Sequence, residues 1–285
     1  MPTEFNAPVQ PGTAVRLADG VVRVTAPNRS LMTGPGTNSY IIGERECTVL
    51  DPGPDIAQHV DALIAAAPGT VGRIVLTHTH PDHSPAAARL KAATGASILG
   101  SPAPADGRQD YSTRIDQAVR DGDVIGTGAE RLLAIATPGH ASNHVCYLHP
   151  ATGLLFSGDH ILNGSTTVIL APDGDMTAYL DSLDRLRRHS MSAIAPGHGA
   201  LLTDPLAAID ALIAHRLRRE SKTLERLRAA GTVSLDALLP SVYDDVSPAL
   251  FDFARCSLEA HLIKLEREQR VVRNGDLWSA SGATR

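Results

Sequence analysis

The chain has 285 residues, which is long enough for one large domain and a second, smaller one. Hydrophobic residues make up 43% of the chain and charged residues 20%, a balance that excludes an intrinsically disordered protein. The net charge of -5 argues against a general polyanion-binding protein, although a local basic groove is compatible with it.

The cysteines and the hydropathy pattern indicate a cytoplasmic protein. Cys47, Cys146 and Cys256 lie far apart and are odd in number, which favours reduced thiols over a disulfide framework. No N-terminal segment joins a basic start to an apolar core, and no apolar run approaches about 18 residues. We therefore expect a cytoplasmic location and no membrane partner.

The first two-thirds of the chain alternates short strands with helices. Residues 15–24 alternate around Asp19-Gly20, which predicts a β-hairpin. Apolar runs predict further strands at residues 40–42, 47–50, 73–77, 97–99, 132–136, 145–148, 154–157 and 193–195. Asp55 is expected to cap one helix, and Ser84 to cap a second that ends at Gly95. The pattern predicts an α/β domain over residues 1–204.

The last third of the chain reads differently. Residues 205–230, 234–239 and 248–268 are predicted helices, and Asn274-Gly275 predicts a hairpin turn within residues 271–279. Three helices followed by a β-hairpin outline a winged helix. We therefore predict a small winged-helix-like domain over residues 205–285.

Four potential metal ligands lie within six residues, at His78, His80, Asp82 and His83. They follow a predicted strand and precede a predicted helix, the place where ligands gather in layered α/β folds. Imidazole and carboxylate donors suit zinc, iron or manganese. A tight loop can direct alternate side chains to one point and adjacent ones to another, so this loop can serve two metals.

Three further loops carry donors of the same kind. His140 ends the motif T-P-G-H, Asp159 lies in S-G-D-H, and His198 lies in P-G-H-G. Each motif follows an apolar run, so the loops can converge with the His78–His83 segment at one edge of a sheet sandwich.

Together these motifs resemble the metallo-β-lactamase superfamily over about residues 38–199. The resemblance implies a four-layer αββα sandwich with a metal site at one edge. It also implies two divalent metal ions, with zinc expected and iron or manganese as alternatives. By position, the first metal would take His78, His80 and His140, the second would take Asp82, His83 and His198, and Asp159 would bridge the two.

The run T-P-G-H-A-S-N-H, the run G-D-H-I-L and the winged helix resemble the branch containing the β-lactamase-like protein 2 endoribonucleases, and more distantly glyoxalase II. Asp159 stands where the B1-type antibiotic hydrolases use Cys, which argues against β-lactamase activity. The first hypothesis is a metal-bridging hydroxide that attacks a phosphodiester, with single-stranded RNA as substrate. The alternative is a glyoxalase II-type hydrolase of a small thioester, ester or lactone. In either case Asp82 would also be catalytic by orienting the hydroxide.

Three residues are candidates for supporting or pocket roles. Asp51 either holds a ligand histidine or its loop, as the resemblance implies, or caps a helix or turn. His144 either supports a ligand, lines the pocket or is an ordinary strand histidine. His160 either points at substrate or orders its loop. Residues 163–167 are Ser/Thr-rich and are expected to form part of the pocket wall. The remaining histidines are expected to have no functional role: His59, His149, His189, His215 and His261.

The C-terminal segment leaves more than one reading open. The basic residues between Arg216 and Arg228 could guide a phosphate backbone, but Glu220 and Glu225 interleave with them and favour a solvated helix face. The winged helix could bind nucleic acid, form a wall of the active site or mediate a homodimer. From residue 205 onward 12 Lys and Arg are balanced by 11 Asp and Glu, so nucleic-acid binding is the least favoured. A non-catalytic binding module is also disfavoured, because no ligand is missing.

Overall fold

The computed structural model describes residues 9–282, so the outer limits of the two predicted domains lie outside the described residues. A seven-stranded sheet runs in the order β1-β2-β3-β4-β5-β6-β7, with β4 to β7 parallel. Its strands are β1 (Ala14–Ala18), β2 (Val21–Thr25), β3 (Asn38–Ile42), β4 (Glu46–Leu50), β5 (Thr70–Val75), β6 (Ser97–Gly100) and β7 (Gln117–Ala118). The predicted hairpin at the start of the chain is confirmed as the antiparallel pair β1 and β2.

A five-stranded sheet packs against the first, in the order β12-β11-β10-β9-β8. Its strands are β8 (Val124–Ile125), β9 (Leu132–Ala136), β10 (Val145–His149), β11 (Leu154–Gly158) and β12 (Ala193–Pro196). Alternate side chains of both sheets meet in one buried cluster, where the rings of Tyr40 and Phe156 lie 4.9 Å apart. The period-2 alternation of each strand leaves its other face for helices.

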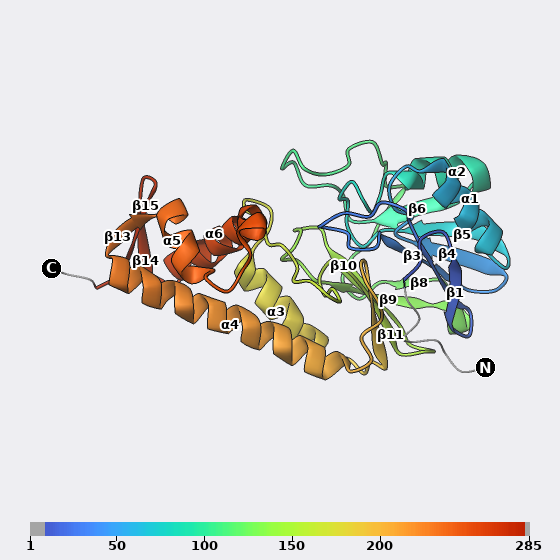
Figure 1. The fold of residues 1–285 in the computed structure, drawn as a ribbon. Coiled ribbons are helices and arrows are strands. Elements are labelled where there is room, and N and C mark those ends of the chain that lie inside the picture. Colours follow the sequence, from blue (N-terminus) through green and yellow to red (C-terminus); the bar gives the residue numbers. More distant parts are fainter. Residues whose placement is uncertain (1–8, 283–285) are drawn as a thin grey trace.

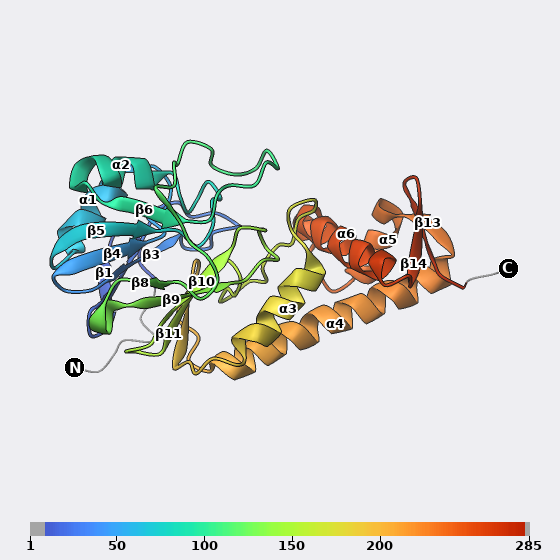
Figure 2. The same ribbon diagram turned by 180° about the vertical axis from the view of Figure 1, so that it is seen from behind.

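Helices cover the outer faces of both sheets. The helices α1 (Ala57–Ala66) and α2 (Ala86–Thr94) bury their apolar sides against the first sheet. The helix α3 (Met176–Leu186) packs on the second sheet, with Tyr179 and Leu183 fully buried. The result is the four-layer αββα sandwich expected from the sequence, seen in Figure 1 from one side and in Figure 2 from behind.

Two of the predicted helix caps are wrong. The residue before α1 is Ile56, and Asp55 instead pairs with Arg89 of α2 through two bonds of 2.6 and 3.2 Å. The residue before α2 is Pro85, while the Ser84 hydroxyl donates to Asp110. In both cases a partner distant in sequence takes the side chain that a local pattern assigns to the helix end. The predicted stop at Gly95 is confirmed, because Gly95 adopts the left-handed conformation at the end of α2.

The C-terminal part has its own buried core and the outline of a winged helix. Its elements are α4 (Pro205–Ala230), β13 (Thr232–Ser234), α5 (Leu235–Val242), α6 (Phe251–Arg267), β14 (Val271–Asn274) and β15 (Leu277–Ala280). The three strands form a sheet in the order β13-β15-β14. Trp278 and Leu258 lie in the core between this sheet and the helices. The short strand β13 was not predicted, because its three residues carry too little pattern.

The helix α4 joins the two parts of the molecule. Ile209 near its start is buried with the second sheet, whereas Leu224 and Leu227 near its end are buried in the C-terminal core. Figures 1 and 2 show this helix running along one side of an elongated molecule, with α3 beside it. The domain limit predicted between residues 204 and 205 stays a prediction, because α4 begins at Pro205 and contributes buried residues to both cores.

Two sequence-level expectations concern the chain as a whole. All three cysteines are unpaired, as expected. Within residues 9–282, none of the helices is both long enough and apolar enough to cross a bilayer.

Candidate metal centre

Five strand ends bring the predicted site residues to one edge of the sandwich. Asp51 follows β4, and the segment from His78 to His83 follows β5 and leads into α2. His140 follows β9, Asp159 follows β11 and His198 follows β12. The loops of the two sheets are tied together, because the Asn38 side chain donates to the carbonyls of Pro196 and Gly199. Residues far apart in the chain therefore meet at this edge.

The structure brings the seven predicted ligands together in two groups. His78, His80 and His140 form the first group, in which every candidate ligand atom lies within 4.8 Å of the others. Asp82, His83, Asp159 and His198 form the second under the same limit. The partition is the one that the family resemblance implies, and the roles as ligands stay predictions.

The Asp159 carboxylate lies between the two groups. Its Oδ1 is 3.2 Å from His83 Nε2 and 3.3 Å from His198 Nε2, in the second group. Its Oδ2 is 3.8 Å from His140 Nε2, in the first group. One oxygen therefore faces each group, which is the arrangement that a bridging carboxylate requires.

Hydrogen bonds on the outer side of the imidazoles fix which nitrogen faces the cluster. His78 Nδ1 lies 2.9 Å from the Thr77 hydroxyl, and His83 Nδ1 lies 3.0 Å from Asp51 Oδ2. His140 Nδ1 donates to the Val168 carbonyl at 2.7 Å, and His198 Nδ1 to the Gly36 carbonyl at 3.1 Å. When Nδ1 carries the ring proton and donates it to such an acceptor, Nε2 keeps its lone pair for a metal.

His80 differs from the other four histidines. Its Nδ1 lies 2.9 Å from His140 Nε2, so Nδ1 is the nitrogen that faces the first group. Three buried atoms at the cluster, His78 Nε2, His83 Nε2 and Asp159 Oδ1, have no hydrogen-bond partner within the described part of the chain. Buried polar atoms without partners are rare, and here they converge on common points. The donor set therefore fits divalent cations.

Asp51 and Thr77 support two of the histidines. The Asp51 carboxylate accepts from the Thr77 backbone N–H and from the Thr77 hydroxyl, each at 2.7 Å, and from His83. The same hydroxyl contacts His78. Asp51 is fully buried and takes the positive φ of 48°, so the fold holds it in place against local preference. Its position is that of a supporting residue.

His144 and His160 lie behind the cluster. His144 Nε2 accepts from the Asp159 backbone N–H at 3.2 Å, so it supports the loop that carries Asp159. His160 is fully buried between the rings of His144 and Tyr179, and neither of its ring nitrogens has a hydrogen-bond partner in the region that the structure describes. It is absent from the residues that line the cavity described below, so its placement favours the role of ordering its loop over contact with substrate.

Two glycines allow the loops to approach this closely. A Cβ on Gly158 would lie 2.5 Å from Thr77 Oγ1 and 2.7 Å from His144 Nε2. A Cβ on Gly197 would lie 2.5 Å from Asp159 Oδ1. Any larger residue would push apart the groups that form the site.

The cluster is anionic where the carboxylates lie. Burial opposes ionisation of Asp159, but the nearby His198 and His83 outweigh it and hold the pKa of Asp159 well below its usual value. Burial likewise opposes a charge on His198, yet Asp159 and Asp82 raise the pKa of His198 to about 10. Burial also lowers the pKa of His78 well below its usual value, which keeps His78 neutral. The carboxylates are thus ionised, and the pKa of His83 is also raised, despite burial, by Asp82 and Asp159, so a bound cation would replace the protons of His83 and His198.

Comparison with known proteins agrees with this geometry. The sequence model of the Metallo-beta-lactamase superfamily matches residues 32–198, which is more than half of the chain. This chain belongs to the metallo-beta-lactamase superfamily. The model of the Beta-lactamase associated winged helix domain matches residues 234–278, within the C-terminal part. The protein is thus a metal-dependent hydrolase of this superfamily with a winged-helix domain.

Relatives in the superfamily match nearly the full chain. A Beta-lactamase-like protein 2 homolog of Drosophila melanogaster is 29% identical over 273 residues, covering 90% of this chain and 91% of that one. The Atrochrysone carboxyl ACP thioesterase dmxR1 of a Cryptosporiopsis species is 25% identical over 247 residues, covering 81% and 74%. The crystal structure of a Beta-lactamase domain protein from Burkholderia ambifaria shares the fold, with a TM-score of 0.82, 19% identity and coverage of 98% and 96%.

A cavity of about 830 Å³ opens over the metal centre of this metallo-beta-lactamase domain. Its floor includes His80, Asp82, His140, Asp159 and His198. Its far wall comes from the winged-helix domain, with Tyr243, Val246, Leu250, Phe253 and Ala254. Leu31 and Met32 stand at the edge and are 76% and 46% exposed. The winged helix thus forms a wall of the cavity over the candidate metal centre, which agrees with one of the three roles expected, and residues 164–166 contribute to the lining as predicted.

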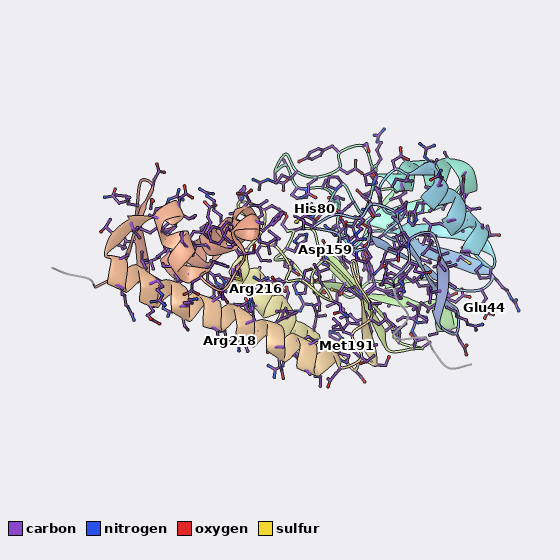
Figure 3. The ribbon with its side chains drawn as sticks, in the orientation of Figure 1. Glu44, His80, Asp159, Met191, Arg216 and Arg218 are labelled. Atoms are coloured by element: carbon purple, nitrogen blue, oxygen red, sulfur yellow. The ribbon has the colours of Figure 1, made fainter. Side chains whose placement is uncertain are left out.

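Arg216 and Arg219 were not predicted as cavity residues, and His215 was expected to have no functional role. All three line the cavity, and the two arginines are buried, so the reading of this basic stretch as a solvated face is wrong for them. Arg218, between them, is exposed on the outer side of α4 (Figure 3). A signal was present, because Arg216 lies seven residues after buried Ile209 and belongs to the inward stripe of the helix.

Proposed function

We propose that this protein hydrolyses a carboxylic ester or thioester whose acyl group is small and largely apolar. The observation that carries the proposal is the cavity, which has the metal ligands on its floor and apolar side chains opposite them. Its volume of about 830 Å³ lies in the range typical of small-molecule sites. A carbonyl group at the floor would place the rest of an acyl chain against Leu250 and Phe253.

The charges in the wall favour a small ester over a nucleic acid. Arg219 forms a two-bond pair with Asp245, at 2.8 and 3.0 Å, and also donates to the Val242 carbonyl. Arg216 donates to the Thr167 carbonyl. Both cations are therefore engaged within the protein. Binding of a single strand depends on a row of available cations along its backbone.

The residues that would hold the metals are those of the two groups, with Asp159 between them. Two divalent cations at such a site supply ionised water at neutral pH and polarise a carbonyl oxygen. Zinc is the metal we propose, and iron or manganese would be accepted by the same nitrogen and oxygen donors.

Asp82 is the candidate catalytic carboxylate. Its Oδ2 lies 3.2 Å from His198 Nε2, and its side chain, at 29% exposed, is open to the cavity. Burial raises its pKa, but His83 and His198 outweigh that effect and keep the pKa of Asp82 below its usual value. An ionised Asp82 can accept a hydrogen bond from the attacking water and orient it toward the carbonyl.

The names of the relatives support two chemistries. The relative from the Cryptosporiopsis species is named an ACP thioesterase, which supports thioester hydrolysis. The relative from Drosophila melanogaster is named a Beta-lactamase-like protein 2 homolog. The sequence motifs resemble that branch, and the resemblance implies phosphodiester hydrolysis of single-stranded RNA, which is the second candidate.

A substrate screen on metal-loaded protein tests the proposal. We expect turnover of aliphatic and aromatic acyl thioesters and esters, with no cleavage of single-stranded RNA, and loss of turnover in Asp82→Ala. Cleavage of RNA with no activity on the acyl substrates would overturn the proposal in favour of the second candidate. Turnover that survives in Asp82→Ala would refute the assigned role of Asp82.

A matched pair of variants in α6 tests the part played by the cavity. Phe253 lines the cavity, whereas Phe251, two residues earlier, packs against the C-terminal core. Phe253→Ala is expected to raise KM about tenfold for a hexanoyl thioester and less for an acetyl thioester, because it removes apolar contact area. Phe251→Ala should leave this chain-length preference unchanged.

A further inference from the structure

The segment from Asp159 to Val168 contacts three parts of the metal centre. It begins at the bridging carboxylate of Asp159. The Thr167 hydroxyl donates to the Asp159 carbonyl at 2.8 Å and lies 3.2 Å from the His160 carbonyl. The next carbonyl, that of Val168, accepts from His140 Nδ1 at 2.7 Å. The position of this one segment therefore determines the positions of the Asp159 carboxylate and of the His140 ring.

One side chain of the C-terminal helix α4 holds this segment from outside. Arg216 donates through Nη2 to the Thr167 carbonyl, between the two points just described. Its guanidinium lies 5.2 Å from the ring centre of Tyr179, whose hydroxyl donates to the His160 carbonyl at 3.0 Å. Arg216 thus contacts the segment directly and through α3. Figure 3 shows Arg216 on the α4 side of the region that contains His80 and Asp159.

The environment of Arg216 is unusual for an arginine. The residue is 2% exposed, and its Nε has no hydrogen-bond partner among residues 9–282. A buried charge without full pairing lowers the stability of the folded protein. An apolar side chain at this position would not carry that cost. Arginine adds a charge-assisted hydrogen bond to the Thr167 carbonyl. The next residue, Val168, carries the carbonyl that accepts from His140.

We propose that Arg216 is a positioning residue for the metal centre. From α4 it fixes the Thr167 carbonyl, and through this segment it holds the Asp159 carboxylate and the His140 ring in place. The winged-helix domain then does more than close the cavity, because the affinity of the catalytic domain for metal depends on it. The proposal rests on the proposed ligand set but not on the proposed substrate.

Metal affinity, measured by competition with a chelator, tests this without any substrate. Zn²⁺ and Co²⁺ are titrated into metal-free full-length protein, and the visible spectrum of bound Co²⁺ reports ligand geometry. Arg216→Met is expected to weaken binding at least about tenfold, as for other losses of outer support around a metal site. It is also expected to alter the Co²⁺ spectrum. Arg216→Lys keeps a hydrogen-bond donor and the charge, so it should recover part of the metal affinity and part of the wild-type Co²⁺ spectrum.

Arg219→Met is the matched control. Arg219 lies one turn later on α4, is buried, and lines the same cavity, but its bonds go to Asp245 and Val242. It is expected to keep the wild-type metal affinity and Co²⁺ spectrum even if it lowers the thermal midpoint. Thr167→Val removes the hydroxyl that ties the segment to Asp159, and its effect should not add to that of Arg216→Met.

Wild-type metal affinity and spectrum in Arg216→Met would overturn the proposal, as would equal losses in Arg219→Met. If Arg216→Met does not fold, Arg216→Lys and Thr167→Val decide: an unchanged Co²⁺ spectrum in both contradicts the proposal. If wild-type protein binds metal and the variants lose affinity as expected, but no acyl substrate is turned over, the proposed function alone fails.

Discussion

Asp51 shows how a single residue can define a metal site without touching the metal. Its carboxylate accepts from Thr77 twice and from His83 once, and thereby orients His83 directly and His78 through the Thr77 hydroxyl. The left-handed backbone at φ 48° costs about 1 kcal/mol or more in an L-residue, although Asp tolerates it better than most. The cost is offset by three hydrogen bonds to buried donors.

Asp51→Asn tests this role at the residue scale. The amide keeps the shape but loses one acceptor oxygen, so His83 or Thr77 loses its partner. We expect affinity for Zn²⁺ to fall about 10- to 100-fold, measured by chelator competition. Asp55→Asn is the control, since Asp55 is an aspartate on the same loop whose bonds go to the exposed Arg89. Equal affinity in the two variants would show that Asp51 has no supporting role.

At the scale of elements, the site depends on how closely strand ends can approach. Gly158 ends β11 with a positive φ of 47°, directly before Asp159. The space that a Cβ would need is occupied by Thr77 and His144, which come from the other sheet and from the start of β10. The two sheets thus approach closely beside Asp159, the proposed bridging carboxylate.

Gly158→Ala should therefore damage both the fold and the site. The positive φ alone costs about 1 kcal/mol, and the clash adds about 1–3 kcal/mol to the loss in free energy of unfolding. Gly95→Ala is matched for φ, at 77°, but its Cβ would meet nothing within 4 Å. Urea unfolding should show the smaller loss for Gly95→Ala, and only Gly158→Ala should bind metal weakly. Similar losses in both would contradict the proposed role of the close approach.

The elements also show what the sequence could and could not predict. Apolar runs and hairpin turns located twelve of the fifteen strands within residues 9–282, and the histidine motifs identified all seven residues of the two groups. Strand patterns and histidine motifs are both formed by residues that are close in sequence, so the sequence alone can reveal them. The caps at Asp55 and Ser84 were wrong, and Arg216 was missed, because their partners Arg89, Asp110 and Thr167 are set by the tertiary fold.

At the scale of the whole molecule, the active site lies between two domains. The catalytic domain supplies the metal ligands on the floor of the cavity, and α4 and α6 supply the facing wall. The helix α4 is shared by both cores, so the wall is held at a fixed place over the floor. Substrate selection and metal chemistry thus belong to different parts of the chain and meet in one cavity.

The central claim is that the two His/Asp groups form a two-metal centre required for hydrolysis. Metal-free protein titrated with Zn²⁺, with bound metal counted by native mass spectrometry and acyl thioester turnover followed in parallel, tests it most directly. The account predicts that two ions bind per chain and that turnover rises as they bind. It also predicts that Asp159→Ala loses two-ion binding and turnover together. Binding of fewer than two ions at saturation, or turnover that persists in metal-free protein, would contradict it.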